Sequence, residues 1–415
     1  MASNRLQFEM PDGMKKWGLG LSAVGLVVLI AGIVTLAMSG KTEDNIRFWG
    51  VLLQNSTFFL MICNAAMFFI CATTLAWGGW QVAFRRVPEA ISTMVPIFGV
   101  LALIVLLCIV HNDHIGSNVY LWLNKEEVAK STGLQGKSGF LNKGFFTTWS
   151  IISIASWWYF GKRMRDLGKK ADEAPMGIEE AKEFTWKSTV RSSLFLVAFG
   201  LTVTSTIPWI WLMSIDAHWY STMYSWYTFA STFVSGMALV AIFVVFLKNQ
   251  GYLPYVTEEH LHDIGKFMFA FSIFWTYLFF SQYMLIWYAN IPEETKYFQP
   301  RLLGNFRGIF FLNLILNFVS PFLIFMKRGA KRNYTMVTFV AIIIIFGHWI
   351  DFYQMVMPGL MNGQFAAHAQ LSWFEFGIAI GYVGMIIFFV GKALAKQPLV
   401  QKFHPFYKES IIHHV

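Results

Sequence analysis

The stretch WGLGLSAVGLVVLIAGIVTLAM, residues 17–38, decides the fold class of this chain. It runs for 22 residues without a charged side chain, and a helix needs about 20 predominantly apolar residues to cross a bilayer. Lys15 and Lys16 precede it, as basic residues do in a signal peptide, but the run exceeds the roughly 7–15 residues of a signal core. We therefore interpret it as a membrane-spanning helix.

Apolar runs of this kind recur along the whole chain. Of its 415 residues, 56% are hydrophobic and only 13% are charged, whereas about a quarter are charged in a soluble domain. Because lipid cannot satisfy backbone polar groups and the runs do not alternate as barrel strands do, we predict helices. We expect an all-α integral membrane protein, one transmembrane domain over 1–415, with about ten spans. The predicted spans are 17–38, 50–77, 90–111, 144–161, 192–215, 222–247, 267–290, 308–326, 334–357 and 372–392.

The Lys and Arg residues indicate the direction of these spans. With ten spans, the side that holds both termini carries 23 of the 32 Lys and Arg residues, and the other side carries 9. Because basic residues are retained in the cytoplasm, both termini are predicted to be cytoplasmic. The net charge of +9 therefore reflects topology rather than a nucleic-acid partner. The charged stretch 162–191 is expected to be a solvated connector, and 214–221 and 358–371 are expected to face outward.

Polar groups within the spans call for an explanation, and the clearest case is Gly347-His348-Trp349-Ile350-Asp351. An ionisable residue at membrane depth costs about 2.5–3.5 kcal/mol on insertion scales. His348 and Asp351 are three residues apart, so they share one helix face, and His348 is about 15 Å or less from the outward end. A carboxylate beside an imidazole can take up a proton and pass it on. The alternative is that the pair only ties neighbouring helices together.

Other polar residues are predicted at the same outward level. They are candidates for proton transfer or for a quinol site, although helix ends are also simply wet. These candidates are His111, Asp113, Asp216, His218, Gln282 and Tyr283, with Asn313 nearby on the next span. No residue is assigned a certain catalytic role.

No metal or haem site is expected in this chain. The three cysteines lack the spacing of zinc or iron–sulfur sites. A haem in the membrane usually needs two deep histidines, but only His348 falls clearly inside a predicted span, whereas His260 and His262 fall in a predicted cytoplasmic loop.

Two prolines predict distorted spans. Pro208 and Pro321 each remove a backbone hydrogen bond, so we expect kinks at Thr204 and Asn317. Broken helices also occur at transporter sites, which keeps a transporter open as an alternative. The aromatic residues between Trp209 and Tyr227 are expected to form a belt at the membrane interface.

Four segments carry a resemblance to a known family: 214–221 (SIDAHWYS), 258–271 (EEHLHDIGKFMFAF), 280–294 (FSQYMLIWYANIPEE) and 347–351 (GHWID). With the chain from about residue 50 onward, they resemble the NrfD-like (polysulfide-reductase-type) membrane subunits of bacterial alternative complex III, and in particular the smaller of its two such subunits.

The resemblance implies a fold and a function. The fold is two four-helix bundles with flanking helices, in the bacterial inner membrane and without a redox centre. The function is that of a cofactor-free subunit of a respiratory quinol:cytochrome c (electron acceptor) oxidoreductase. It supports quinol oxidation and proton transfer near the periplasmic side, with quinol or quinone as a possible ligand. The quinol site is usually placed in the larger NrfD-like subunit, which leaves a structural or proton-moving role here.

The resemblance also implies partners. These are an iron–sulfur subunit, a multihaem cytochrome c subunit, the second NrfD-like subunit and small membrane subunits, with a terminal oxidase as a further partner. Two alternatives to a proton-moving subunit stay open, namely a secondary transporter and a purely structural scaffold of the complex.

Overall fold

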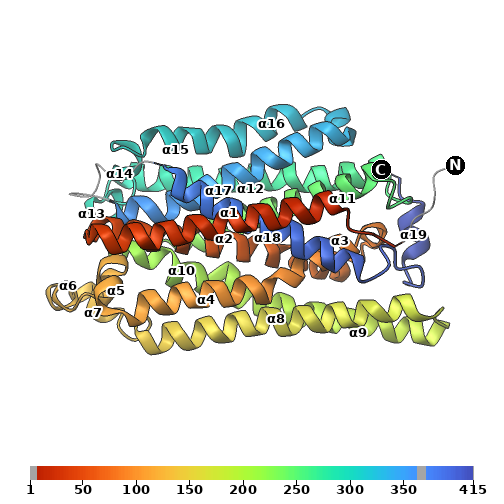
Figure 1. The fold of residues 1–415 in the computed structure, drawn as a ribbon, viewed down its shortest axis with the longest axis horizontal. Coiled ribbons are helices and arrows are strands. Elements are labelled where there is room, and N and C mark those ends of the chain that lie inside the picture. Colours follow the sequence, from red (N-terminus) through yellow and green to blue (C-terminus); the bar gives the residue numbers. More distant parts are fainter. Residues whose placement is uncertain (1–6, 362–370, 415) are drawn as a thin grey trace.

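A computed structural model describes residues 7–361 and 371–414. The structure is 82% helical. In the described residues, the single β-type pairing is an isolated bridge between Gln7 and Pro398, so the all-α prediction is confirmed. The long helices run side by side along the long axis of the molecule (Figure 1).

Nine helices in the described part of the chain are long and apolar enough to cross a membrane, which indicates a multi-pass membrane protein. Three of them are composite, because a π-helical or 3₁₀ turn interrupts the α-helix. The nine are α1 (Asp12–Ser39), α2 (Thr42–Leu75), α3 with α4 (Arg86–His111), α9 with α10 (Ile178–Trp211), α11 (Tyr224–Asn249), α12 (Glu258–Ala289), α15 with α16 (Arg307–Phe325), α17 (Tyr334–Leu360) and α18 (Trp373–Ala395).

The remaining predicted span, 144–161, is the fourth along the chain. It lies within α8 (Lys143–Glu173), which is not among these nine helices. It is rich in Ser, Thr and Trp, and these residues bond to the neighbouring helix. Trp149 Nε1 donates to Thr206 Oγ1 at 2.7 Å, and Trp157 Nε1 donates to Thr202 Oγ1 at 2.8 Å. The low apolarity of α8 therefore reflects helix–helix hydrogen bonds, and its crossing of the membrane stays a prediction.

Two predicted loops are helical instead. The charged stretch 162–191 continues α8 to Glu173 and starts α9 at Ile178. Ion pairs one turn apart, such as Lys182 with Glu179 at 2.7 Å, stabilise helices in water. Likewise α12 begins at Glu258, so His260 and His262 lie in its first turns and are buried. Charge marked both stretches as loops, but charge does not prevent a helix from continuing beyond the membrane.

The predicted distortions near Pro208 and Pro321 are confirmed. Thr202–Thr206 (η4) and Ile315–Val319 (η6) wind as π-helix directly before these prolines. Hydroxyl groups bond to carbonyl oxygens at the distorted turns: Thr206 Oγ1 donates to Leu201 O at 2.7 Å and Ser320 Oγ donates to Ile315 O at 3.0 Å. Side chains therefore help to satisfy the backbone where the helix departs from α geometry.

Helix packing surrounds two centres. The α2, α4, α8 and α9 helices contact one another in a closed ring, and α11, α12, α15–α16 and α17 form a second ring. The contacts of α2 with α11 and with α17 join the two rings. Because α2 and α11 lie at this junction, most of their side chains are buried.

The two ends of the molecule differ. One end carries the short helices α5 (Asp113–Val119), α6 (Lys125–Lys130), α7 (Thr132–Gly136), α13 (Pro292–Thr295) and α14 (Gln299–Leu302) (Figure 1). The first and last described residues lie at the opposite end of the molecule (Figure 1). There Gln7 pairs with Pro398, and His413 Nε2 lies 2.7 Å from Asp263 Oδ2 near the start of α12. We call these the loop end and the termini end. Most of the loop predicted at 358–371 lies outside the described residues.

Helix α1 packs closely on α18 through glycines. The buried residues of α1 are Gly18, Gly25 and Gly32. A Cβ added to Gly25 would press against the Cα of Gly381 on α18 and lie 3.0 Å from its N. Small residues allow two membrane helices to approach this closely.

Replacing Gly25 with leucine should therefore destabilise the α1–α18 pair by about 1–3 kcal/mol, the usual cost of overpacking. The matched control is Gly20→Leu, because no heavy atom lies within 4 Å of a Cβ at Gly20. Both changes raise helix propensity equally. Unfolding in mild detergent should show a loss for Gly25→Leu alone, and equal stability of the two variants would contradict this packing.

Candidate functional site

His348 and Asp351 lie in the buried middle of α17, and neither side chain is exposed (0% for both). Helix α17 extends to Leu360, three residues beyond the predicted span. At 1.5 Å per residue, Asp351 is about 14 Å and His348 about 18 Å from this end of the helix. His348 is therefore slightly deeper than predicted, because the helix is longer.

The Asp351 carboxylate accepts hydrogen bonds from three different helices. Trp275 Nε1 on α12 donates to Oδ2 at 2.8 Å, and Asn313 Nδ2 on α15 donates to Oδ1 at 2.8 Å. The Tyr227 hydroxyl on α11 also donates to Oδ1. Hydrogen bonds to a charged group are about twice as strong as neutral ones. Three converging donors therefore make the site fit to hold a carboxylate without water.

His348 lies beside this carboxylate with one ring nitrogen uncommitted. Its Nδ1 forms a 2.9 Å hydrogen bond with Ser231 Oγ on α11, and is 3.7 Å from Asp351 Oδ2, beyond hydrogen-bond length. Its buried Nε2 has no hydrogen-bond partner among the described residues. An unsatisfied buried polar atom costs about 1–3 kcal/mol, so a water molecule that hydrogen-bonds to this nitrogen would be stabilised.

The π-helical turn η6 fixes the orientation of Asn313, which bonds to Asp351. Asn317 Nδ2 donates to Asn313 Oδ1 at 2.5 Å, which fixes the amide that binds Asp351. A Cβ at Gly347 would meet the Asn317 Oδ1 atom and lie 2.8 Å from Leu316 Cβ. Glycine at position 347 therefore allows α17 to approach the π turn closely, which explains its place beside His348.

A second polar group lies toward the loop end, centred on Arg301 of α14. Its side chain is only 3% exposed. The guanidinium lies over the Tyr297 ring at 3.5 Å, donates to Gln354 O at 3.1 Å and is 3.4 Å from Asp216 Oδ2. Trp219 stacks on the other side of Tyr297, with 3.8 Å between ring centroids. Arg301 is thus a buried cation held between α17 and the loop that carries Asp216.

A small cavity separates the two polar groups. Tyr227 and Arg301 both line it, together with Gln282 and Gln354. Its volume is about 20 Å³, and one water molecule needs about 10–15 Å³ of such space. Gln282 Nε2 and Gln354 Oε1 are buried without a hydrogen-bond partner among the described residues. The cavity therefore offers space and polar groups for a single water between Tyr227 and Arg301.

The predicted site residues fall into two sets. His348, Asp351, Gln282 and Asp216 belong to the buried network or line its extension. The other candidates lie elsewhere: His218 is exposed, His111 Nε2 bonds to Thr147 Oγ1 at 3.0 Å, Asp113 pairs with Lys143, and Tyr283 packs on Phe298. The candidates were predicted at the same depth of the membrane, but this did not place all of them in one site.

Several residues of the network were not predicted from the sequence. Tyr227 was expected in an interfacial belt, but it is buried and binds Asp351, and Trp211 and Tyr224 are buried as well. The side chains of Trp226 and Tyr220 are exposed. Arg301 entered the sequence analysis only as a positive charge. Its sequence signal was a lone arginine beside Pro300, which is too weak to indicate burial.

Burial governs the titration of Asp216, which lies in η5 (Met213–Asp216), outside the spans. Burial raises its pKa above the usual range, and Arg301 offsets this only in part. A carboxyl group with a raised folded pKa stabilises the fold most at low pH and loses that contribution as pH rises through the folded pKa.

The stability advantage of the native protein over Asp216→Asn should therefore be largest at acidic pH and shrink toward pH 7. Thermal unfolding of both proteins from pH 4 to 8 measures this difference. An advantage that instead grows with pH would mean that the attraction of Arg301 outweighs burial and lowers the Asp216 pKa.

Comparison with protein-family models and with curated proteins finds no match for this chain. The resemblance described above therefore stays a prediction. Within residues 7–361 and 371–414, no three His, Cys, Asp or Glu side chains gather as a metal site would require. The expected absence of a cofactor also stays a prediction.

Proposed function

We propose that this chain is the cofactor-free membrane subunit of a bacterial respiratory quinol:electron-acceptor oxidoreductase, in which the Asp351 network moves protons toward the loop end. The observation that carries the proposal is a fully buried carboxylate with three donors from three helices, beside a histidine with an uncommitted nitrogen. Such groups are rare inside membranes and usually mark proton relays.

The proton steps follow from the contacts. A proton that enters from the side of His348, whose Nδ1 is 3.7 Å from Asp351 Oδ2, makes Asp351 a neutral acid, and the Tyr227 hydroxyl then gives its own proton to a water in the small cavity. Asp351 returns a proton to the phenol oxygen, so Tyr227 ends unchanged. Beyond the cavity, on the far side of Arg301, we assign Asp216 as the next proton acceptor, with Arg301 favouring its charged form. Each step uses a group that can both give and accept a proton.

The size of the cavity beside the Asp351 network favours proton movement over solute transport at these residues. A pocket for a small organic molecule usually measures about 300–1,000 Å³, whereas the cavity beside Tyr227 measures about 20 Å³. A quinol headgroup does not fit there either. We therefore place quinol oxidation in a partner subunit, and assign proton movement to this chain.

The helix arrangement supports the family proposal in two ways. The closed rings of α2–α4–α8–α9 and α11–α12–α15/α16–α17, with α1 and α18 alongside, fit two four-helix bundles with flanking helices. The joint position of the chain ends fits two cytoplasmic termini in the bacterial inner membrane. The loop end would then face the periplasm and the iron–sulfur and multihaem cytochrome c subunits.

Purification from the native membrane in mild detergent tests the assignment to a complex. We expect iron–sulfur and c-type haem subunits and a second NrfD-like subunit to accompany the chain, with quinol oxidation activity. A chain that purifies alone, without iron or haem, would contradict the proposal and favour a transporter.

A further inference from the structure

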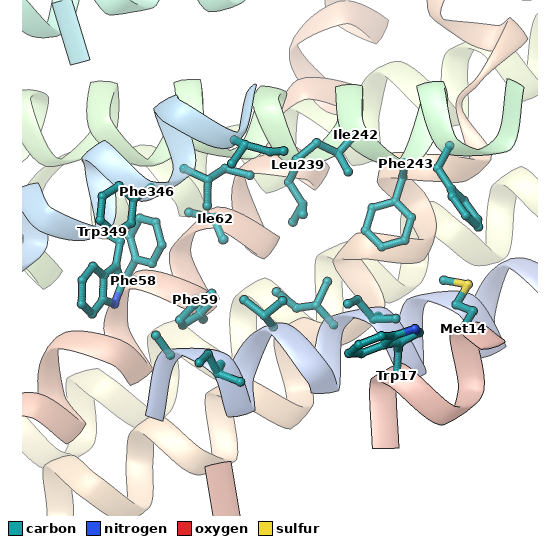
Figure 2. Close-up of a pocket in the computed structure, with 18 of the residues that line it drawn as sticks. Met14, Trp17, Phe58, Phe59, Ile62, Leu239, Ile242, Phe243, Phe346 and Trp349 are labelled. Carbon is teal, nitrogen blue, oxygen red and sulfur yellow. The ribbon is translucent and has the colours of Figure 1, made fainter. Parts of the chain in front are cut away.

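A long apolar cleft lies on the opposite side of α17 from the polar network. Its volume is about 760 Å³, and its walls come from α1, α2, α11, α17 and α18. Figure 2 shows Phe58, Phe59, Leu239, Phe243, Phe346 and Trp349 facing one elongated space, with Met14 and Trp17 at one end.

The cleft spans about one leaflet of a bilayer. Along α18 its lining runs from Phe376 to Ile387, which corresponds to about 16 Å at 1.5 Å per residue. Half of a hydrocarbon core about 30 Å thick is about 15 Å. One end of the cleft lies at Met14, Trp17 and Gln250, near the start of α1 and the end of α11, and so at the membrane surface of the termini end.

The lining excludes a buried polar headgroup. At the deep end, the Trp349 N–H is already committed to Asn55 Oδ1 at 2.9 Å. The polar side chain that lines the cleft elsewhere is Gln250, at the mouth. Because a quinol headgroup needs hydrogen-bond partners, the lining favours a plain hydrocarbon chain whose polar part stays at the mouth.

The mouth itself is basic. Met10 and Met14 lie against Gly391 of α18, where an added Cβ would be 2.9 Å from Met14 Cε, so the start of α1 and the end of α18 meet there. Lysines stand at these helix ends and at the adjoining end of α11. Lys15 pairs with Asp12 at 3.1 Å and Lys248 donates to Leu253 O and Pro254 O, so Lys16 and Lys392 are the lysines that we assign to a phosphate.

From length, lining and charge, we propose that this cleft binds an acyl chain of an anionic phospholipid from the leaflet at the termini end. The phosphate would lie at the lysine-rich mouth, where basic residues near a membrane surface attract anionic lipids. The inference does not depend on the proposed respiratory function.

Native mass spectrometry of the protein, purified with whatever subunits accompany it and then delipidated, tests the proposal. Dioleoyl phosphatidylglycerol and dioleoyl phosphatidylcholine serve as the added probes. We expect one tightly bound phosphatidylglycerol and weaker binding of phosphatidylcholine. Ala379→Trp fills the cleft and should reduce phosphatidylglycerol binding about tenfold, because a few methylene contacts amount to that much.

Matched variants separate the parts of the proposal. Ala23→Trp adds the same side chain on the exposed face of α1, outside the cleft, and should leave lipid binding unchanged. Ile242→Trp fills the cleft from α11, in case Ala379→Trp does not fold. Lys16→Gln with Lys392→Gln should abolish the preference for phosphatidylglycerol while keeping binding of the acyl chain.

Three results would overturn the inference. The first is equal lipid binding by both cleft-filling variants and Ala23→Trp. The second is retention of a quinone rather than a phospholipid in this cleft. The third is displacement of the added lipid by a partner helix, seen as loss of binding whenever accompanying subunits are present.

Discussion

The Asp351→Asn protein is expected to lose quinol-driven proton release by about 100-fold or more, the usual contribution of a positioned acid–base group. Asparagine keeps the size of the side chain, and its one carbonyl oxygen can still accept from Asn313 and Tyr227 at the Oδ1 position. Its NH2 group replaces the oxygen that accepts from Trp275, and it cannot take up and return a proton. Proton release by the purified complex in sealed vesicles, with a pH-sensitive dye outside, measures the effect.

Glu375→Gln is the matched control, because it also removes a fully buried carboxylate. Glu375 lies on α18 and pairs with Arg47 at 2.7 Å, away from the Asp351 network. This variant should be less stable but should release protons at the native rate. If Asp351→Asn released protons like the native protein, Asp351 would only tie helices together, as the scaffold alternative holds.

The Glu89→Ala protein is expected to lose about 3–5 kcal/mol of stability, because it leaves the buried Arg85 without its counter-charge and removes one of the two carboxylates that pair with the buried Arg86. Glu89 of α3 accepts from Arg85 Nε at 3.1 Å, from Arg86 Nη1 and from Gln401 Nε2 at 3.3 Å. Arg86 also pairs with Asp172 of α8. One carboxylate thus joins three parts of the chain at the termini end.

Denaturant titration in detergent measures this loss. Glu179→Ala removes an exposed carboxylate that pairs with Lys182, and should change stability by no more than the error of the assay. A Glu89→Ala protein as stable as this control would mean that water or lipid headgroups compensate the arginines, and that the cluster does not stabilise the termini end.

The spans could be predicted because lipid imposes a simple rule on each segment separately. Charge-free runs marked all nine apolar helices of the described residues, and Pro208 and Pro321 marked the two π-helical turns. The same rule predicted span 144–161 in α8, although Trp149 and Trp157 make this helix less apolar and hydrogen-bond to Thr206 and Thr202 of η4, and its crossing of the membrane stays a prediction. The rule failed where helices leave the membrane, as the charged start of α9 does.

The site could be predicted only in its ionisable centre. His348 and Asp351 stood out because charge at membrane depth is costly. Trp275 and Tyr227 did not, because aromatic residues are common in spans and their role depends on which helices meet. Arg301 reaches the network through folding of the segment between α12 and α15. Contacts between distant segments are not recorded in the local pattern of any one span.

Difference infrared spectroscopy of the complex during quinol oxidation tests the central claim most directly, because a protonated buried carboxyl group has its own C=O stretching band. The account predicts that such a band appears or disappears with turnover in the native protein and is missing from Asp351→Asn. Turnover without this band, or the same band in both proteins, would contradict proton transfer through Asp351.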